Sequence, residues 1–192
     1  MIYLASQSPR RSQILQDANI SFEILISSAE EEFNDAHSVA DNAKRLALVK
    51  AKAALEKIEI ESRQYLPILS ADTIVAVDGH MLGKPKDAAE ARDMLKLLSN
   101  RQHSVVTGVA LVDREKKFHT ISVETLLYFK KLEELEIENY ISTNEPYDKA
   151  GGISSQGGAK KFITKVIGSR SNVLGLPLEE SLDLLKRAKV CS

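Results

Sequence analysis

The sequence predicts an α/β fold, because short apolar runs of strand length alternate along it with segments of helical periodicity. The composition agrees with a globular chain: of 192 residues, 43% are hydrophobic and 28% are charged, and the formal net charge is −1. So small a net charge argues against a surface built to bind nucleic acid or an anionic membrane, so any basic site must be local. The length suits one domain, or two lobes with a shared core, and we expect a single domain over residues 1–192.

The first residues and the cysteine count predict a location. The chain starts without the basic stretch and apolar run of a secretory signal, and no apolar stretch reaches the roughly 18 residues of a membrane span. The single cysteine, Cys191, cannot form an intramolecular disulfide, which favours a reducing compartment and a thiol without a role. We therefore expect a cytoplasmic protein without a membrane or nucleic-acid partner.

The first half of the chain alternates strand and helix signals. Residues 2–5 form a short apolar run, and Ser8 and Pro9 suit the N-cap and first position of a following helix. An acidic stretch then leads into a long amphipathic segment, and Asp78-Gly79 is a hairpin turn signal after a strongly apolar run. We expect strands over residues 2–5, 22–26 and 66–77 and helices over residues 9–18 and 38–58.

The second half opens on a well-marked helix. Asp87 and Glu90 fit the N-cap and N3 positions of a capping box. The apolar positions after them have the i, i+3, i+4, i+7 spacing of an amphipathic helix; they are Ala91, Met94, Leu95 and Leu98. We also expect a hairpin of residues 104–112 and 119–129, a helix over residues 132–143, a glycine-rich segment over residues 151–158 and a closing amphipathic helix marked by Leu178, Leu182 and Leu185.

Two arginines follow the first helix start. A strand, a short loop and a helix N-terminus present backbone N–H groups to an anion. Arg10 and Arg11 lie in the first turn, where a cation faces the positive end of the helix dipole at about 0.3–1 kcal/mol each. A bound polyphosphate would offset that conflict, and the guanidinium fork suits phosphate. The alternative is a pair of solvated arginines beside a capped helix.

Asp72 interrupts a strongly apolar β-like run. A carboxylate there must be paired, hydrogen-bonded or bound to a metal, so Asp72 could hold magnesium or deprotonate a water molecule. Alternatively, it is bonded to amides at a strand bend. Lys84, in Gly83-Lys84-Pro85, lacks the Walker A pattern but could place an ammonium on a phosphate. Lys50 follows Leu46 by one turn, and periodicity favours a stem over the core with its charge in water, rather than a side chain in a cleft.

The glycine-rich segment carries Gln156, an amide that could both donate to and accept from the edge of a base. Glycines there allow the backbone to approach a ligand closely. The alternative is a flexible surface loop. The histidines show no metal-ligand spacing, and none is assigned to chemistry; they are His37, His80, His103 and His119.

Together these segments resemble the Maf family of nucleotide pyrophosphatases, in order and across nearly the whole chain. The matching stretches are Leu4-Ala5-Ser6, Ser8-Pro9-Arg10-Arg11, Ser70-Ala71-Asp72-Thr73-Ile74-Val75, Leu82-Gly83-Lys84-Pro85, Thr107-Gly108, Glu145-Pro146, Asp148-Lys149-Ala150-Gly151, Gln156-Gly157, Asn172-Val173 and Gly175-Leu176-Pro177-Leu178. The resemblance implies an elongated, two-lobed α/β fold around a mixed sheet with a central cleft, similar to that of inosine-triphosphate pyrophosphatase. It also implies hydrolysis of a nucleoside triphosphate to the monophosphate and pyrophosphate, a divalent cation (Mg²⁺ or Mn²⁺), a homodimer and a link to arrest of septum formation.

The resemblance also implies roles for single residues. Asp72 becomes the proton acceptor, and Glu31 a further carboxylate near the metal, although Glu30 or Glu32 could align instead. The implied phosphate ligands are Ser8, Arg10, Arg11, Lys50 and Lys84.

Three positions separate the branches of the family: Arg10, Thr73 and Gln156. All three are similar to the branch that acts on dTTP and UTP. The branch acting on 7-methyl-GTP has an aromatic residue, an amide and an acid there. The chain departs from the family at Gly152-Ile153-Ser154-Ser155, where an aromatic and a branched apolar residue are usual, so we expect a roomier loop on the base side. The alternatives to a dTTP and UTP pyrophosphatase are a pyrophosphatase of the 7-methyl-GTP type and a nucleotide-binding regulator of division without turnover.

Overall fold

The computed structural model describes residues 1–29, 32–153 and 156–190. The predictions for Glu30, Glu31, Ser154, Ser155 and Cys191 therefore lie outside the described residues. The elements in chain order are β1 (Ile2–Ala5), α1 (Pro9–Asp17), β2 (Phe22–Ile24), α2 (Val39–Ile60), β3 (Ile68–Val77), β4 (His80–Leu82), α3 (Ala88–Leu98), β5 (Gln102–Val112), β6 (Phe118–Phe129), α4 (Glu134–Ile141), β7 (Ile163–Ile167), α5 (Arg170–Val173) and α6 (Leu178–Arg187), with three 3₁₀ turns between α4 and β7.

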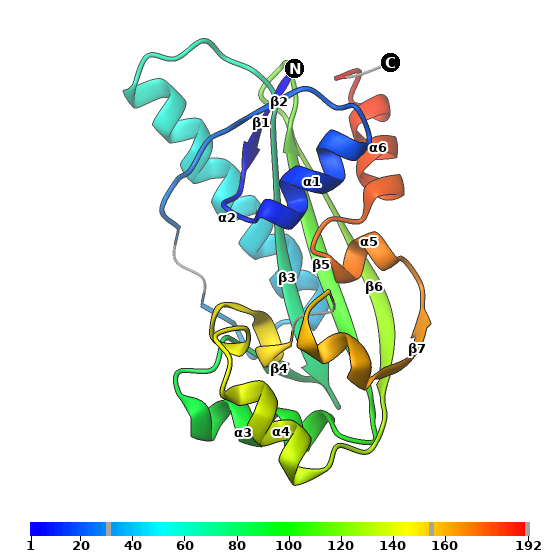
Figure 1. Cartoon of the computed structure of the whole chain (residues 1–192). Coiled ribbons are helices and arrows are strands. Elements are labelled where there is room, and N and C mark those ends of the chain that lie inside the picture. The colour runs from blue at the N-terminus through cyan, green and yellow to red at the C-terminus, as the bar shows by residue number, and fades with distance from the viewer. Residues whose placement is uncertain (30–31, 154–155, 191–192) are drawn as a thin grey trace.

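The described residues form one mixed, seven-stranded sheet with the strand order β2-β1-β3-β5-β6-β7, and β4 pairs with β3. Strand β1 is parallel to β2 and β3, whereas the remaining pairs are antiparallel. The long strands β3, β5 and β6 run through the whole elongated molecule (Figure 1). They carry a first lobe, made of β1, β2, α1 and α6, at one end and a second lobe, made of β4, α3 and α4, at the other.

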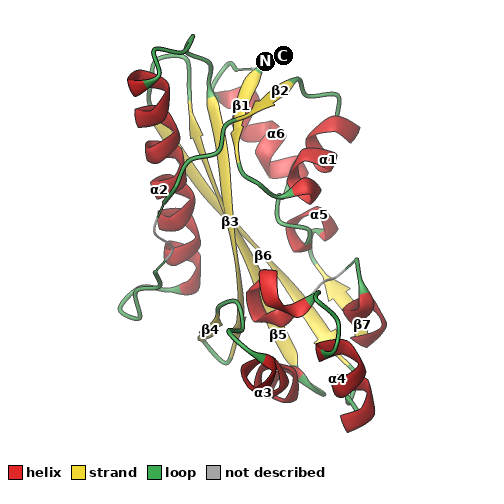
Figure 2. Ribbon diagram, turned by 60° about the vertical axis from the view of Figure 1, so that its left-hand side comes forward, coloured by secondary structure: helices red, strands yellow, loops and turns green. Residues whose placement is uncertain are grey.

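Helix α2 covers one face of the sheet, and α1, α5 and α6 lie on the opposite face (Figure 2). Alternation along β3 sorts its side chains between these faces. Ile68 and Ile74 pack in the clusters that include α2, whereas Leu69 and Ala71 pack with α1 and α6. Asp72 shares the face of Ile68 and Ile74, and Thr73 shares the face of Leu69 and Ala71. Consecutive residues are thus presented to different helices.

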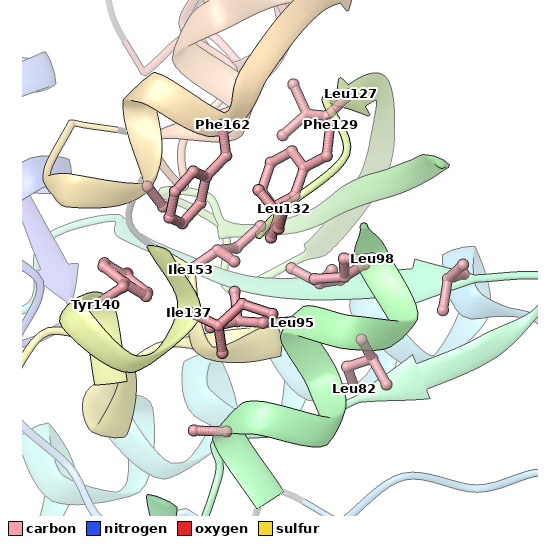
Figure 3. Close-up of a cluster of buried hydrophobic side chains, with 14 of the residues drawn as sticks. Leu82, Leu95, Leu98, Leu127, Phe129, Leu132, Ile137, Tyr140, Ile153 and Phe162 are labelled. Carbon is pink, nitrogen blue, oxygen red and sulfur yellow. The ribbon is translucent and has the colours of Figure 1, made fainter. Parts of the chain in front are cut away.

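The second lobe has its own apolar cluster, which packs α3 and α4 against the far ends of the long strands (Figure 3). Phe129 and Phe162 meet edge to face at its centre, with ring centroids 5.9 Å apart. Ile153 belongs to this cluster and also lines the large cleft described below. The wall of the cleft is therefore continuous with a packed core.

Gly108 on β5 lets α2 lie directly on the sheet. A Cβ atom at this position would lie 2.1 Å from the backbone carbon and oxygen of Ala43. The face of α2 turned to the sheet is rich in fully buried alanines, which also permit a short approach. Gly108 pairs in register with Asp72, so this close approach brings α2 beside that residue.

Most predicted elements are confirmed, with ends within a few residues. Asn100, in the turn after α3, adopts a positive φ of 55°, as an asparagine replacing glycine can. The capping box is half formed: Asp87 accepts from the amide of Glu90, but Glu90 accepts from the amide of Lys86 rather than that of Asp87. Ser8 occupies the N-cap position of α1 and Pro9 its first position, as predicted, although the hydroxyl of Ser8 makes no capping bond.

Apolar periodicity gives no signal for β7 or α5. Strand β7 exposes Thr164 and Lys165 in succession, so it lacks the alternation that marks a half-buried strand. Helix α5 spans only four residues, too few for a periodic signal. Within the part of the chain that is described, no helix has the length and apolar character needed to cross a membrane.

Candidate active site

A stretch of β3 is open along one edge. On that edge β1 pairs with β3 as far as Ser70, and β4 pairs from Val75 onward. Among the described strands, none pairs with Ala71 to Ile74 on this edge, while β5 pairs with the whole stretch on the other. The open stretch holds Asp72 and Thr73. A polar pair in an apolar strand thus lies where the sheet is interrupted, between the two lobes.

A cleft of about 720 Å³ lies at this opening. It brings together seven of the predicted site residues from α1, α2, β3 and the loop after β4: Ser8, Arg10, Arg11, Lys50, Asp72, Thr73 and Lys84. Gln156 is exposed and is not part of the lining, and Glu31 lies outside the described residues. The structure therefore gathers the predicted phosphate and catalytic groups, but not the predicted base-reading amide.

The ammonium of Lys50 forms an ion pair with Oδ1 of Asp72. Their side chains are only 16% and 9% exposed, respectively. The expectation that the Lys50 charge reaches water is wrong, because α2 packs closely enough on the sheet for the lysine to turn toward the open edge of β3. A buried carboxylate needs such a partner to remain ionised at low cost. Asp72 also lies within a continuous strand, so the alternative of an Asp at a strand bend is wrong.

Arg11 is held by three groups around the cleft. Its Nε donates to the carbonyl of Gly175 at 2.7 Å, and its Nη1 and Nη2 donate to the hydroxyls of Ser6 and Thr73 at 3.1 Å each. A guanidinium bonded on both its edges has a defined orientation. The alternative of two solvated arginines is therefore wrong for Arg11, which links α1, β3 and the segment after α5.

Arg10 differs from its neighbour. Its side chain is half-buried and lines the cleft, but within the described residues no hydrogen bond or ion pair reaches its guanidinium. It stands in the first turn of α1, next to backbone N–H groups that the helix itself does not use. This end of the cleft therefore combines a free-standing positive charge with the positive end of a helix dipole.

The structure adds residues that the sequence reasoning did not assign. Lys149 lines the cleft, and the hydroxyl of Ser6 accepts both from Arg11 and from the amide of Ser8. The signal for Lys149 was its place in the motif Asp148-Lys149-Ala150-Gly151. Among the described residues that line the cleft, five are basic (Arg10, Arg11, Lys50, Lys84 and Lys149), and Asp72 alone is acidic. In a chain with a net charge of −1, such a concentration of cations marks a site for a polyanion.

The segment that carries Gln156 is attached through Glu145. The carboxylate of Glu145 accepts from the amide of Gly158 at 2.8 Å, and a Cβ on Gly157 would lie 2.3 Å from that carboxylate. The turn just after Gln156 is thus pinned to the end of the second lobe.

The donor set fits a cation that arrives with a phosphate ligand. Across the described residues, no three His, Cys, Asp or Glu side chains form a cluster able to hold a metal by themselves. Magnesium commonly binds one or two carboxylates together with substrate phosphates and water. Asp72 supplies one carboxylate beside the basic groups, and this is sufficient for such a shared site.

The relatives found by comparison with known proteins agree with one another. Residues 1–188 match the profile of the family described as Maf-like protein. A dTTP/UTP pyrophosphatase from Citrifermentans bemidjiense is 47% identical over 186 residues, covering 96% of this chain and 94% of that protein. Another from a Geobacter species is 46% identical over 186 residues with the same coverage. The solved structure of a HAM1 protein from Coxiella burnetii is 16% identical with a TM-score of 0.53, covering 97% of this chain and 98% of that one, which confirms the fold alone.

Proposed function

The chain belongs to the Maf family, and from this premise we propose that it hydrolyses dTTP and UTP to the nucleoside monophosphate and pyrophosphate. One observation supports this proposal most: a buried carboxylate at the open edge of β3, surrounded by basic side chains from several elements. A polyanion cleft with one candidate base suits hydrolysis of a phosphoanhydride. The relatives at 46–47% identity carry the name dTTP/UTP pyrophosphatase.

In this proposal the chain works mainly by positioning. Arg10, Arg11 and Lys84 bind the phosphates, and Asp72 accepts a proton from the attacking water. Water then adds to phosphorus as the anhydride bond between the α and β phosphates breaks, and pyrophosphate leaves. Lys50, which holds one oxygen of Asp72, keeps that carboxylate oriented toward the cleft. The basic side chains stabilise the charge that accumulates on the leaving group.

We propose that Asp72, with the phosphates of the substrate, holds a Mg²⁺ or Mn²⁺ ion. When bound, the ion would neutralise phosphate charge and stabilise the leaving pyrophosphate. The role proposed for Glu31 as a second ligand concerns a residue outside the described part of the chain. Equilibrium dialysis of Mn²⁺ with and without a non-hydrolysable triphosphate analogue tests the shared site, and the expected result is metal binding that depends on the analogue.

Pyrimidine selectivity is proposed from Arg10, Thr73 and Gln156, which are similar to the dTTP and UTP branch at all three positions. The amide of Gln156 suits the imide edge of uracil or thymine, since it can both donate and accept. Gln156 lies outside the lining of the cleft, so its part in this proposal rests on the resemblance alone.

The decisive assay supplies purified protein and Mg²⁺ or Mn²⁺ with dTTP, UTP, CTP, 7-methyl-GTP and ITP. Pyrophosphate and monophosphate are detected separately, and an Asp72→Asn variant runs alongside. Pyrophosphate from dTTP and UTP that disappears in the variant is the expected outcome. Turnover of 7-methyl-GTP alone would retain the chemistry and refute the proposed base recognition. Triphosphate binding with no product would favour a regulator without turnover.

We also propose that the enzyme is a homodimer and works in the cytoplasm, where its nucleotide substrates are formed. Light scattering coupled to gel filtration tests the first proposal, with a mass near twice 21.2 kDa as the expected result. Fractionation of the producing cell tests the second.

A further inference from the structure

We propose that Thr107 is a positioning residue for Arg11, acting through the hydroxyl of Thr73. The proposal rests on the proposed function in one respect: Arg11 is taken to be a phosphate ligand. It gives a role to the motifs Thr107-Gly108, Asn172-Val173 and Gly175-Leu176, which the catalytic scheme leaves unused.

The contacts form a continuous chain. Nη2 of Arg11 lies 3.1 Å from Oγ1 of Thr73, and that hydroxyl lies 2.9 Å from Oγ1 of Thr107. Oγ1 of Thr107 lies 3.2 Å from the carbonyl oxygen of Asn172. The two threonines are register partners on β3 and β5, so the pairing of the strands fixes their hydroxyls side by side.

The direction of each hydrogen bond follows from the ends of the chain. The guanidinium of Arg11 can only donate, so Thr73 accepts from it. The carbonyl of Asn172 can only accept, so Thr107 donates its single hydroxyl proton to that oxygen. Thr107 must then accept from Thr73. Both hydroxyl protons are therefore committed, and Thr73 keeps no donor for a ligand in the cleft. In this chain of bonds Thr73 orients Arg11, and Thr107 orients Thr73.

The far end of the chain is rigid. Thr107 and Asn172 are fully buried. The side-chain amide of Asn172 donates to the carbonyl of Val105 at 2.9 Å and to Oγ1 of Thr125 at 3.0 Å, which anchors α5 to the sheet. A chain of aligned bonds ending on an anchored carbonyl transmits orientation better than a hydroxyl free to rotate.

The same segment also holds Arg11 directly. The carbonyl of Gly175 accepts from Nε of Arg11, and Gly175 has a φ of +104°. A Cβ at Gly175 would lie 3.3 Å from Nε of Arg11 and 3.4 Å from Oγ1 of Thr73, so glycine permits this close approach. The segment after β7 therefore fixes one guanidinium at two points: directly through Gly175, and through Asn172, Thr107 and Thr73.

The test compares Thr107→Val, which removes only the hydroxyl from a nearly isosteric side chain, with Thr107→Ser, which retains it. Two readouts are the affinity for inorganic pyrophosphate by calorimetry and kcat and KM for dTTP. We expect Thr107→Val to weaken pyrophosphate binding and lower kcat/KM by about fivefold, the range of one neutral hydrogen bond, and Thr107→Ser to stay within about twofold of wild type. In an Arg11→Lys background, Thr107→Val should have almost no further effect.

Tyr3→Phe is the matched control, because it removes one hydroxyl from a side chain of nearly the same shape. Tyr3 is also buried, and its hydroxyl donates to the carbonyl of Gln64 at 3.1 Å, outside the chain of bonds that ends on Arg11. We expect it to lower the melting temperature with little change in pyrophosphate affinity. Should Thr107→Val not fold, Thr73→Val breaks the same chain at the end that lines the cleft and must reproduce the expected loss.

The outcomes separate the two proposals. If Thr107→Val and Thr107→Ser weaken binding equally, if Tyr3→Phe has the same effect, or if the loss persists in the Arg11→Lys background, the positioning role is overturned. If the wild-type protein binds pyrophosphate but hydrolyses no nucleotide, the proposed activity fails while the role of Thr107 is still decided by affinity. If it neither binds nor hydrolyses, both proposals are overturned.

Discussion

The ammonium of Lys50 on α2 pairs with the carboxylate of Asp72 on β3, across a separation of 22 residues in the sequence. Neither residue, taken alone in the sequence, predicts this ion pair. A lysine near the apolar face of a helix most often extends to water, and an aspartate in a strand is most often bonded to backbone. The pair forms because α2 lies directly on the sheet at Gly108, and because none of the described strands pairs with β3 on the edge beside Asp72.

Removing one partner of this pair leaves a charge without compensation. Lys50→Met should therefore lower the free energy of unfolding by about 2 kcal/mol, less than the roughly 3–5 kcal/mol of a fully enclosed pair because the cleft admits water. Adding Asp72→Asn to Lys50→Met should restore most of that loss, whereas pyrophosphate release remains absent. Urea titration of both single variants and the double variant measures the coupling. Strictly additive losses would show that the two charges do not stabilise one another.

Gly108→Ala should force α2 away from the sheet. The added methyl would overlap the backbone of Ala43, and overpacking of this kind costs about 1–3 kcal/mol or more. Since the same contact places Lys50, dTTP hydrolysis should also fall. Gly83→Ala is the matched control for stability, because its nearest neighbour is a side-chain atom of Phe33 at 3.8 Å. A melting temperature for Gly108→Ala equal to that of Gly83→Ala would contradict the close approach.

His103 should make the protein sensitive to acid. Burial lowers the pKa of His103 from its ordinary value of 6.5 to about 4. Between about pH 6.5 and 4 the unfolded chain therefore binds a proton at this side chain that the folded chain does not bind. As a result, this group does not lower the free energy of unfolding above pH 6.5, and it lowers it progressively as the pH falls toward 4. The slope approaches about 1.4 kcal/mol per pH unit. In His103→Phe that part of the slope should vanish, while in His80→Phe, at an exposed position, it should remain. Urea midpoints of the wild type and both variants, measured across this pH range, test the prediction.

The charge of Arg10 should lower the stability of the fold and strengthen phosphate binding. Its cation faces the positive end of α1, so Arg10→Gln should raise stability by about 0.3–1 kcal/mol. The same change removes a phosphate ligand, so the KM for dTTP should rise, and the salt dependence of binding should weaken. Thermal melts with and without pyrophosphate measure both effects. A variant less stable than wild type, with unchanged KM, would show that Arg10 serves the fold instead.

The sequence by itself determined the local structure and the chemical inventory. Apolar periodicity, the turn at Asp78-Gly79 and Asp87 at a helix start are properties of neighbouring residues, so they predicted most helices and strands. The charged groups placed against local preference, Asp72 in an apolar strand and Arg10 at a helix start, pointed to the site. The succession of motifs indicated the Maf family.

Only the tertiary structure decided how these groups meet. The interruption between β1 and β4, the pairing of Lys50 with Asp72 and the hold of Gly175 on Arg11 each join residues far apart in the chain. Such contacts depend on strand register and on how closely a helix can approach a sheet, and neither is encoded in local periodicity. The sequence therefore supplied the cations and the carboxylate, and the packing of α2 and the C-terminal segment on the sheet gave them their orientation.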